Sequence, residues 1–190
     1  RSSAASDVYK RQVQSKLCIG LKCGIEPTSK EYYALMLGGC IFGGSPFSKL
    51  FTNVREKLSL AYYASVRTER FKSTMFISSG IETDKYQAAY DEILVQFNKM
   101  KSGDITDSEV VNSKLYLTNG FNSMKDGLRT MEDYYLSQAI MDNKGEIDDL
   151  IEMTNKVTKE EIVEAFNKVE IDTVYFLKAV SYTHLTLPTI

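Results

Sequence analysis

The sequence lacks tryptophan and holds only three cysteines, three prolines and one histidine. Because no apolar run approaches the roughly 18 residues of a membrane helix, we expect no membrane partner. An odd and small number of cysteines argues against a disulfide framework and favours a reducing, cytoplasmic location. With 23 Lys and Arg against 25 Asp and Glu, the chain has no electrostatic reason to bind nucleic acid.

The two ends of the chain have complementary coding sequences. One back-translation of Asp7–Gln12 has a reverse complement that encodes Val-Ser-Tyr-Thr-His, the sequence of residues 180–184. The same string resembles the transposase end sequence used to build sequencing libraries. We therefore interpret residues 1–12 and 180–190 as translated sequencing adaptor, and set them aside before considering the fold.

Residues 13–179 remain as one domain. The ends hold three basic residues and one acidic residue, so removing them leaves 20 basic and 24 acidic residues, a net charge of −4. The only histidine, His184, is removed with them. Because the remaining segment has no initiating Met, we expect a fragment of a longer reading frame. A chain of this size can bury roughly 70% of its unfolded surface.

The first part of this segment predicts a strand and then two helices. Residues 15–25 alternate, which places Leu17, Ile19 and Leu21 on one strand face. Thr28 and the glutamate three residues later have the spacing of a capping box, which predicts the start of a helix. The glycine pair at residues 43–44 predicts its end. A second helix is predicted to begin with Ser45 as N-cap, followed by Pro at the first helical position.

The remainder predicts strands and helices that combine into an α+β fold. Aromatic and branched residues indicate strands at 60–66, 74–81 and 173–177. Helical periodicity predicts helices at 84–101, 106–141 with glycine interruptions, 146–155 and 158–168, and Thr106 and Thr158 have capping-box spacing. The sequence thus predicts a mostly antiparallel sheet covered on one face by helices.

A longer pattern resembles a known family. The run 37–63 contains a Gly-rich turn, a serine, Leu-Phe, then Arg-Glu and Leu-Ala-Tyr, and the likeness continues at 79–81, 103–109 and 157–162. It resembles the C-terminal half of M16 metallopeptidases, the group of pitrilysin, insulin-degrading enzyme and mitochondrial processing peptidase. The resemblance covers essentially all of 13–179 and implies an M16/LuxS-like metalloenzyme half-domain.

The resemblance also implies where zinc should be. In the family, the first half carries His-x-x-Glu-His and a distant Glu, which bind zinc and activate its water. Residues 13–179 contain no histidine, and Cys18 and Cys23 lie five apart on one strand, hence on opposite faces. We interpret these cysteines as core or surface thiols. We expect no metal site and no catalytic residue in this fragment, with zinc in the missing first half.

By resemblance, the second half supplies an Arg and a Tyr seven residues later that reach the zinc site. Arg55 and Tyr62 have that spacing, so we assign them to substrate binding. A guanidinium and a phenol O–H can position a peptide carbonyl and stabilise an oxyanion. The alternative is a surface Arg and a core Tyr, since strict alternation would place Tyr62 on one strand face with Ala64 and Val66.

A glycine pair and a small basic cluster each allow a structural and a functional interpretation. Gly43 and Gly44 before a helix could hold a phosphate, but the P-loop motif is absent, and a helix end followed by an N-cap is the interpretation we favour. The basic residues Arg67, Arg70 and Lys72 fit a solvated hairpin tip better than a nucleic-acid contact.

Two hypotheses for function follow. The first is the substrate-binding, non-zinc second half of an M16-like zinc peptidase, inactive as an isolated fragment, whose partners are the missing N-terminal half and a peptide. The alternative is a non-catalytic scaffold or substrate-presenting subunit of a paired M16-like complex, of a bacterial type associated with elongation factor P modification. In that case the partner is a zinc-bearing subunit.

Overall fold

The computed structural model describes residues 14–179, so the segments interpreted as adaptor, 1–12 and 180–190, lie outside the described residues. The elements, in chain order, are β1 (Ser15–Lys22), α1 (Glu31–Gly39), η1 (Cys40–Gly44), η2 (Phe51–Lys57), β2 (Ala61–Glu69), β3 (Thr74–Ile81), η3 (Thr83–Lys85), α2 (Tyr86–Ser102), α3 (Asp107–Met124), α4 (Leu128–Ile140), α5 (Ile147–Lys156), α6 (Lys159–Asn167) and β4 (Glu170–Leu177). No helix among these residues is long and apolar enough to cross a bilayer.

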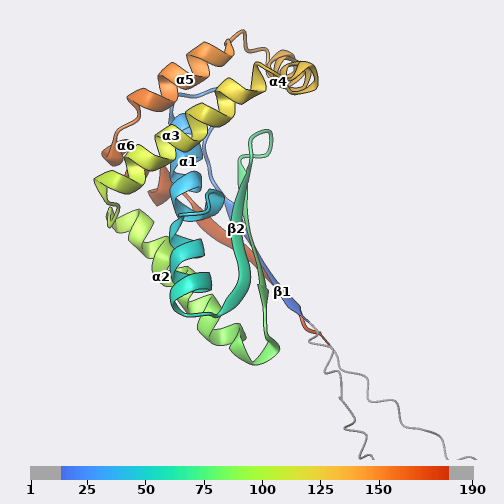
Figure 1. The fold of residues 1–190 in the computed structure, drawn as a ribbon, viewed down its shortest axis with the longest axis vertical. Coiled ribbons are helices and arrows are strands. Elements are labelled where there is room, and N and C mark those ends of the chain that lie inside the picture. Colours follow the sequence, from blue (N-terminus) through green and yellow to red (C-terminus); the bar gives the residue numbers. More distant parts are fainter. Residues whose placement is uncertain (1–13, 180–190) are drawn as a thin grey trace, which may run out of the picture.

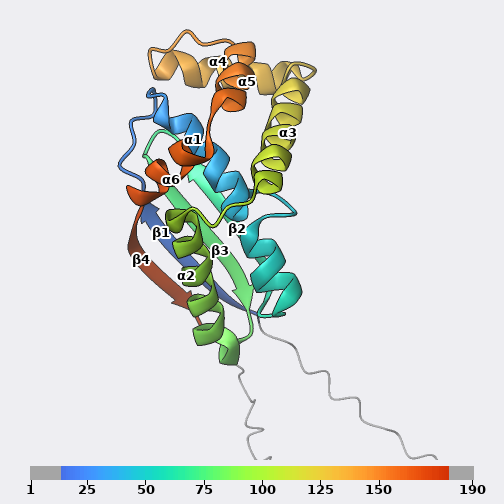
Figure 2. The ribbon, with the colours of Figure 1, turned by 90° about the vertical axis from the view of Figure 1, so that its left-hand side faces the viewer.

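The four strands form one antiparallel sheet in the order β2-β3-β1-β4. Leu17, Ile19 and Leu21 are buried on one face of β1, as their alternation predicted. Figure 2 shows α1, α2 and α6 in front of this face, and their apolar residues join those of β1 and β3 in one core. The predicted α+β fold, with helices covering one face of the sheet, is confirmed.

Two strands are longer than their sequences predicted. β2 continues through Glu69, because Arg67 pairs with Phe76 and Glu69 with Thr74 across the hairpin. β4 begins at Glu170, three residues before the predicted start. In both cases pairing with a neighbouring strand keeps polar residues in the sheet, which overrides their weak strand propensity.

The predicted N-caps of the first two helices were wrong. Helix α1 begins after Lys30, without a side-chain cap, because Ser29 instead closes a turn by donating from its backbone and hydroxyl to the Glu26 carbonyl. Ser45 is extended, with a φ of −129°. Ser48 caps the following helical residues, since its hydroxyl accepts from the Phe51 N–H at 3.4 Å.

Both later capping boxes are present as predicted. Thr106 and Thr158 each accept a hydrogen bond from the N–H of the glutamate three residues on, and that glutamate bonds back to the cap N–H. The predicted long helical region divides into α3 and α4 at Gly127, where the Thr130 hydroxyl donates to the last carbonyl of α3. Figure 1 shows that α4 and α5 extend past the end of the sheet, where a smaller apolar cluster joins them.

Replacing Thr158 with alanine is expected to lower the free energy of unfolding by about 1 kcal/mol, because it removes the cap of α6. Thr28 has the same spacing to a glutamate but is exposed and does not cap a helix, so Thr28→Ala is the matched control. It should change the free energy of unfolding by less than about 0.5 kcal/mol. Urea unfolding measures both. Equal losses would contradict the assignment of the caps.

The centre of the core is a group of three aromatic rings. Phe42 lies 5.8 Å from Phe97 and 5.9 Å from Phe166, measured between ring centroids. Gly38 on α1 allows Phe166 of α6 to come this close, since a Cβ at Gly38 would lie 2.3 Å from the Phe166 ring. This packing fixes α1, and therefore η1 and η2, against the sheet.

Candidate functional site

Arg55 lies on η2 and faces away from the core. Leu50 and Val54 are fully buried and anchor this helical segment, which leaves Arg55 exposed. The guanidinium carbon lies 4.6 Å from the centroid of the Phe51 ring. At this distance the ring face attracts a cation, so Phe51 holds the side chain along the segment.

Tyr62 is placed by a β-bulge, and the face predicted from strict alternation was wrong. Ala61 pairs with Ile81 and Tyr63 pairs with Gly80, so Tyr62 is the extra residue between them. The bulge takes Tyr62 off the face shared by Ala64 and Val66, and its side chain is 43% exposed. Tyr62 is therefore not a core residue.

The sequence did not reveal two charged residues beside Tyr62. The Tyr62 hydroxyl donates to a Glu82 carboxylate oxygen at 3.4 Å. Lys85 donates to the same oxygen at 3.2 Å and to the Ser59 carbonyl at 3.2 Å. The pairing of Ala61 with Ile81 brings Glu82 to this position, and that register has no local sequence signal.

Arg55 and Tyr62 line one pocket, of about 390 Å³, together with Ser59, Glu82 and Lys85. Partial burial raises the pKa of Tyr62, and the nearby Glu82 carboxylate raises it further. The hydroxyl therefore stays protonated and can donate. The pocket thus offers the Arg55 cation, a phenol donor and the Lys85–Glu82 ion pair. The guanidinium and the phenol suit the carbonyl oxygens or carboxylates of a bound peptide.

The other sequence features have structural roles. Gly43 lies one residue before the end of η1 and against β2, where a Cβ would lie 2.4 Å from Val66, so close packing at a helix end accounts for it. Arg67 pairs with Glu69 at 2.8 Å. Arg70 donates to the Pro27 carbonyl at 3.0 Å, which holds the hairpin tip against the loop before α1.

Cys18 is half-buried on the sheet, whereas Cys23 and Cys40 are buried, and all three are free thiols. Burial raises the pKa of Cys23 to about 11 and also raises the pKa of Cys40. We expect iodoacetamide at neutral pH to alkylate Cys18 in the folded protein and the other two only after unfolding. Peptide mapping by mass spectrometry tests this, and equal labelling of all three would contradict the burial.

A zinc ion does not fit the described part of the chain. Within residues 14–179, no three His, Cys, Asp or Glu side chains come together as metal ligands would. Zinc is held by three or four such ligands. His184, the only histidine of the chain, lies outside the described residues.

Comparison with known proteins identifies the family. The model of the family described as the peptidase M16 inactive domain matches residues 3–117. The chain therefore belongs to the peptidase M16 family, as its inactive domain. The resemblance seen in the sequence is confirmed.

Individual relatives agree with this assignment. YmfF of Bacillus subtilis, described as a probable inactive metalloprotease, is 39% identical over 165 residues, which cover 87% of this chain and 39% of YmfF. YmxG of the same species, an uncharacterized zinc protease, is 28% identical over 167 residues, 87% of this chain and 38% of YmxG. A conserved protein of Enterococcus faecalis has a crystal structure with a TM-score of 0.83 and 31% identity, covering 90% of this chain and 40% of that one.

The chain spans about two fifths of the length of these relatives. Relatives described as zinc proteases indicate that zinc belongs to the family. The matched part is the family's inactive domain, which is consistent with the non-catalytic half of a zinc-protease-like protein.

Proposed function

We propose that this chain is the substrate-binding second half of an M16-like peptidase, in which Arg55 and Tyr62 contact the peptide. The observation that supports it is that both side chains line one pocket, although they come from different elements, η2 and β2. Two donors placed in advance can hold a peptide carbonyl without reorganising when it binds. Both groups are polar, exposed and close to the surface, as contact with an external substrate requires.

We assign separate tasks to the residues of this pocket. The Tyr62 hydroxyl would donate to a peptide carbonyl in place of its 3.4 Å contact with Glu82, which is long enough to exchange easily. The Arg55 guanidinium would bind a second oxygen with its planar fork of donors. Lys85 would keep its contact with Glu82 after Tyr62 has released that carboxylate.

In this proposal zinc and its activated water belong to the other half, which the chain does not contain. Partners are that half, or a zinc-bearing M16 subunit, together with a peptide, and we propose a cytoplasmic location. The alternative is a substrate-presenting subunit without chemistry of its own. The description of YmfF as an inactive metalloprotease favours this alternative.

The DNA upstream of codon 13, amplified from the source sample, decides between the two. We expect it to encode His-x-x-Glu-His and a later Glu, which would make this chain the substrate clamp of a zinc peptidase. An upstream half with the same fold but without those zinc ligands would refute the peptidase proposal and support the non-catalytic subunit. The search would then move to a neighbouring gene for the zinc-bearing partner.

A further inference from the structure

The strand β4 leaves one edge of the sheet without a neighbour. In the order β2-β3-β1-β4 it is the last strand, and among residues 14–179 only β1 pairs with it. Figure 2 shows β4 at the outer edge of the sheet, with no other described element beyond it. Such an edge presents backbone N–H and C=O groups with which another strand can pair.

Five residues of this edge lack the features by which proteins protect an exposed strand. A β-bulge between Ile171 and Thr173 makes Asp172 the extra residue of β4. From Thr173 to Leu177 the pairing with β1 is regular, and the sequence Thr-Val-Tyr-Phe-Leu contains no charge and no proline. Charges, prolines and bulges are the usual means of preventing edge-to-edge pairing. We call residues 173–177 the open edge of β4.

The opposite edge of the sheet is different. β2 has the Tyr62 bulge near its start, and Arg67 and Glu69, which pair with each other, near its end. Both features discourage the addition of a strand. Of the two edges of the described sheet, the open edge is therefore the one that suits a further strand.

Apolar side chains of the open edge are exposed on both faces of the sheet. Tyr175 is 59% exposed and Leu177 is 53% exposed, on the face that the described helices leave uncovered. Val174 lies on the other face, opposite the fully buried Ile19, yet it is 37% exposed. A neighbouring strand would cover side chains on both faces, and burial of apolar surface favours association.

We propose that the open edge binds a second copy of this chain, so that the two β4 strands pair antiparallel about a two-fold axis at Tyr175. In this register Thr173 lies opposite Leu177 of the second copy. Val174 lies opposite Phe176 of the second copy, on the helix-covered face of both. The two four-stranded sheets then continue into one. The pairing is independent of the proposed function, because the pocket between η2 and β2 takes no part in it.

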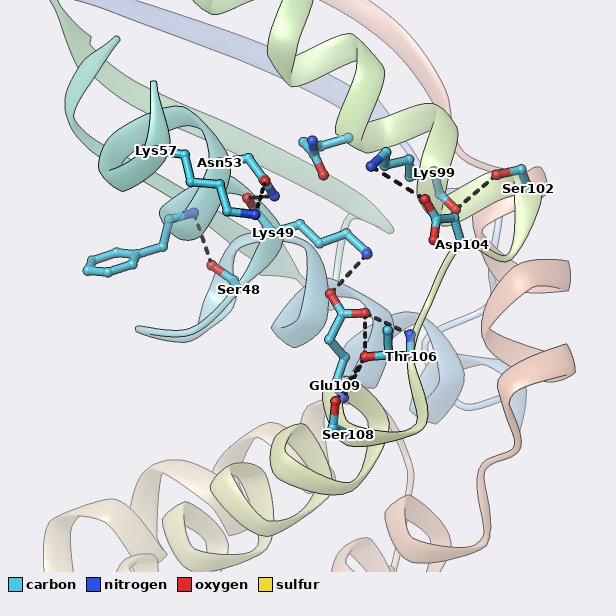
Figure 3. A network of polar contacts seen from close by, with 12 residues as sticks. Ser48, Lys49, Asn53, Lys57, Lys99, Ser102, Asp104, Thr106, Ser108 and Glu109 are labelled. Carbon is cyan, nitrogen blue, oxygen red and sulfur yellow. Dashed lines mark hydrogen bonds and ion pairs between the residues drawn. The ribbon is translucent and has the colours of Figure 1, made fainter. Parts of the chain in front are cut away.

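Two charges at the ends of β4 have no partner within the described chain. At the start of α3, by contrast, Glu109 pairs with Lys49 at 2.9 Å (Figure 3). Glu170 begins β4 and Lys178 follows its last residue, and both are exposed. Among residues 14–179, neither lies within ion-pair distance of an opposite charge.

An antiparallel second copy supplies both missing partners. Because the two strands run in opposite directions about Tyr175, the start of one β4 lies beside the end of the other. Glu170 of each copy then approaches Lys178 of the other, and the attraction occurs twice by symmetry. A parallel pair would instead bring like charges together. The charge pattern therefore favours a second copy over an unrelated strand.

Sedimentation equilibrium of the full chain tests the pairing. We expect a concentration-dependent dimer, with twice the 21.5 kDa of one chain. Tyr175→Lys should leave a monomer, because it places two like charges opposite each other at the axis. An equimolar mixture of Tyr175→Lys and Tyr175→Glu should restore the dimer, since the opposed charges then attract. Phe76→Lys, at an exposed aromatic residue of the central strand β3, is the control and should leave the dimer intact.

Three results would overturn the proposal. The first is a full chain that is monomeric at every concentration, or a Tyr175→Lys variant that dimerises as well as the wild type. The second is a dimer that Phe76→Lys dissociates, because the contact would then be a sheet face rather than the edge. The third is a monomeric complete protein, because its remaining part would then cover β4.

A disulfide measures the register. Tyr175→Cys, in a Cys18→Ser background because Cys18 lies opposite Tyr175 on β1, should give a cross-linked dimer on mild oxidation. Leu177→Cys, on the same face of the same strand, is the matched control. Its two copies would lie about 14 Å apart along the strands, beyond the roughly 7 Å that a disulfide spans, so it should not cross-link. Equal cross-linking of the two variants on a non-reducing gel would contradict the two-fold axis at Tyr175 and overturn the proposal.

Discussion

The proposed function predicts that replacing Arg55 with alanine, in the complete protein with the proposed zinc-bearing half, lowers kcat/KM for peptide cleavage by more than about tenfold. A tenfold loss corresponds to about 1.4 kcal/mol of transition-state stabilisation, the scale of one charged hydrogen bond. The melting temperature should not fall, because Arg55 is exposed and rests on the face of Phe51 rather than in the core.

Two further variants complete the Arg55→Ala experiment. Arg55→Lys keeps the charge but loses the planar fork of donors, so we expect partial recovery of turnover. Arg67→Ala removes an exposed arginine whose partner is Glu69, away from the pocket, and should leave turnover unchanged. If Arg55→Ala cleaves peptide as fast as the wild type, the role assigned to Arg55 is wrong.

Replacing Phe166 with alanine is expected to lower the free energy of unfolding by about 3–5 kcal/mol. Phe166 is fully buried and packs against both Phe42 and Phe97, so its removal leaves a cavity between α6, η1 and α2. The cavity would also open beside α1, whose Gly38 lies against the Phe166 ring.

Phe71→Ala is the matched control for this variant. Phe71 is 51% exposed at the hairpin tip, so the same change of side chain should cost less than about 0.5 kcal/mol. Denaturant unfolding measures both differences at constant pH. A loss below about 1 kcal/mol for Phe166→Ala would contradict the central position of this ring in the core.

Where the sequence repeated a short-range pattern, prediction succeeded. The alternation at Leu17, Ile19 and Leu21 gave the buried face of β1, and the Thr106 and Thr158 capping boxes gave the starts of α3 and α6. Each of these patterns lies within a few residues. The capping hydrogen bonds are local, and the alternation of a strand decides which side chains share a face whatever packs against it.

Where the outcome depended on distant pairing, prediction failed. The bulge at Tyr62 arises from the register of β2 against β3, and it moved a predicted strand-face residue into a pocket. Glu82 joined that pocket through the same register. The Thr28 prediction failed for a local reason instead, because Ser29 closes a turn with Glu26, three residues earlier, and the helix begins after it. Family resemblance found Arg55 and Tyr62, but not the charges around them.

The most direct test of the central claim is a crystal structure of the complete protein with a bound, uncleaved peptide. The proposed function predicts that the Tyr62 hydroxyl and the Arg55 guanidinium lie about 2.7–3.2 Å from oxygens of the peptide. It also predicts that the pocket of about 390 Å³ faces the other half of the protein. A peptide bound elsewhere, with Arg55 and Tyr62 both exposed to solvent, would contradict it.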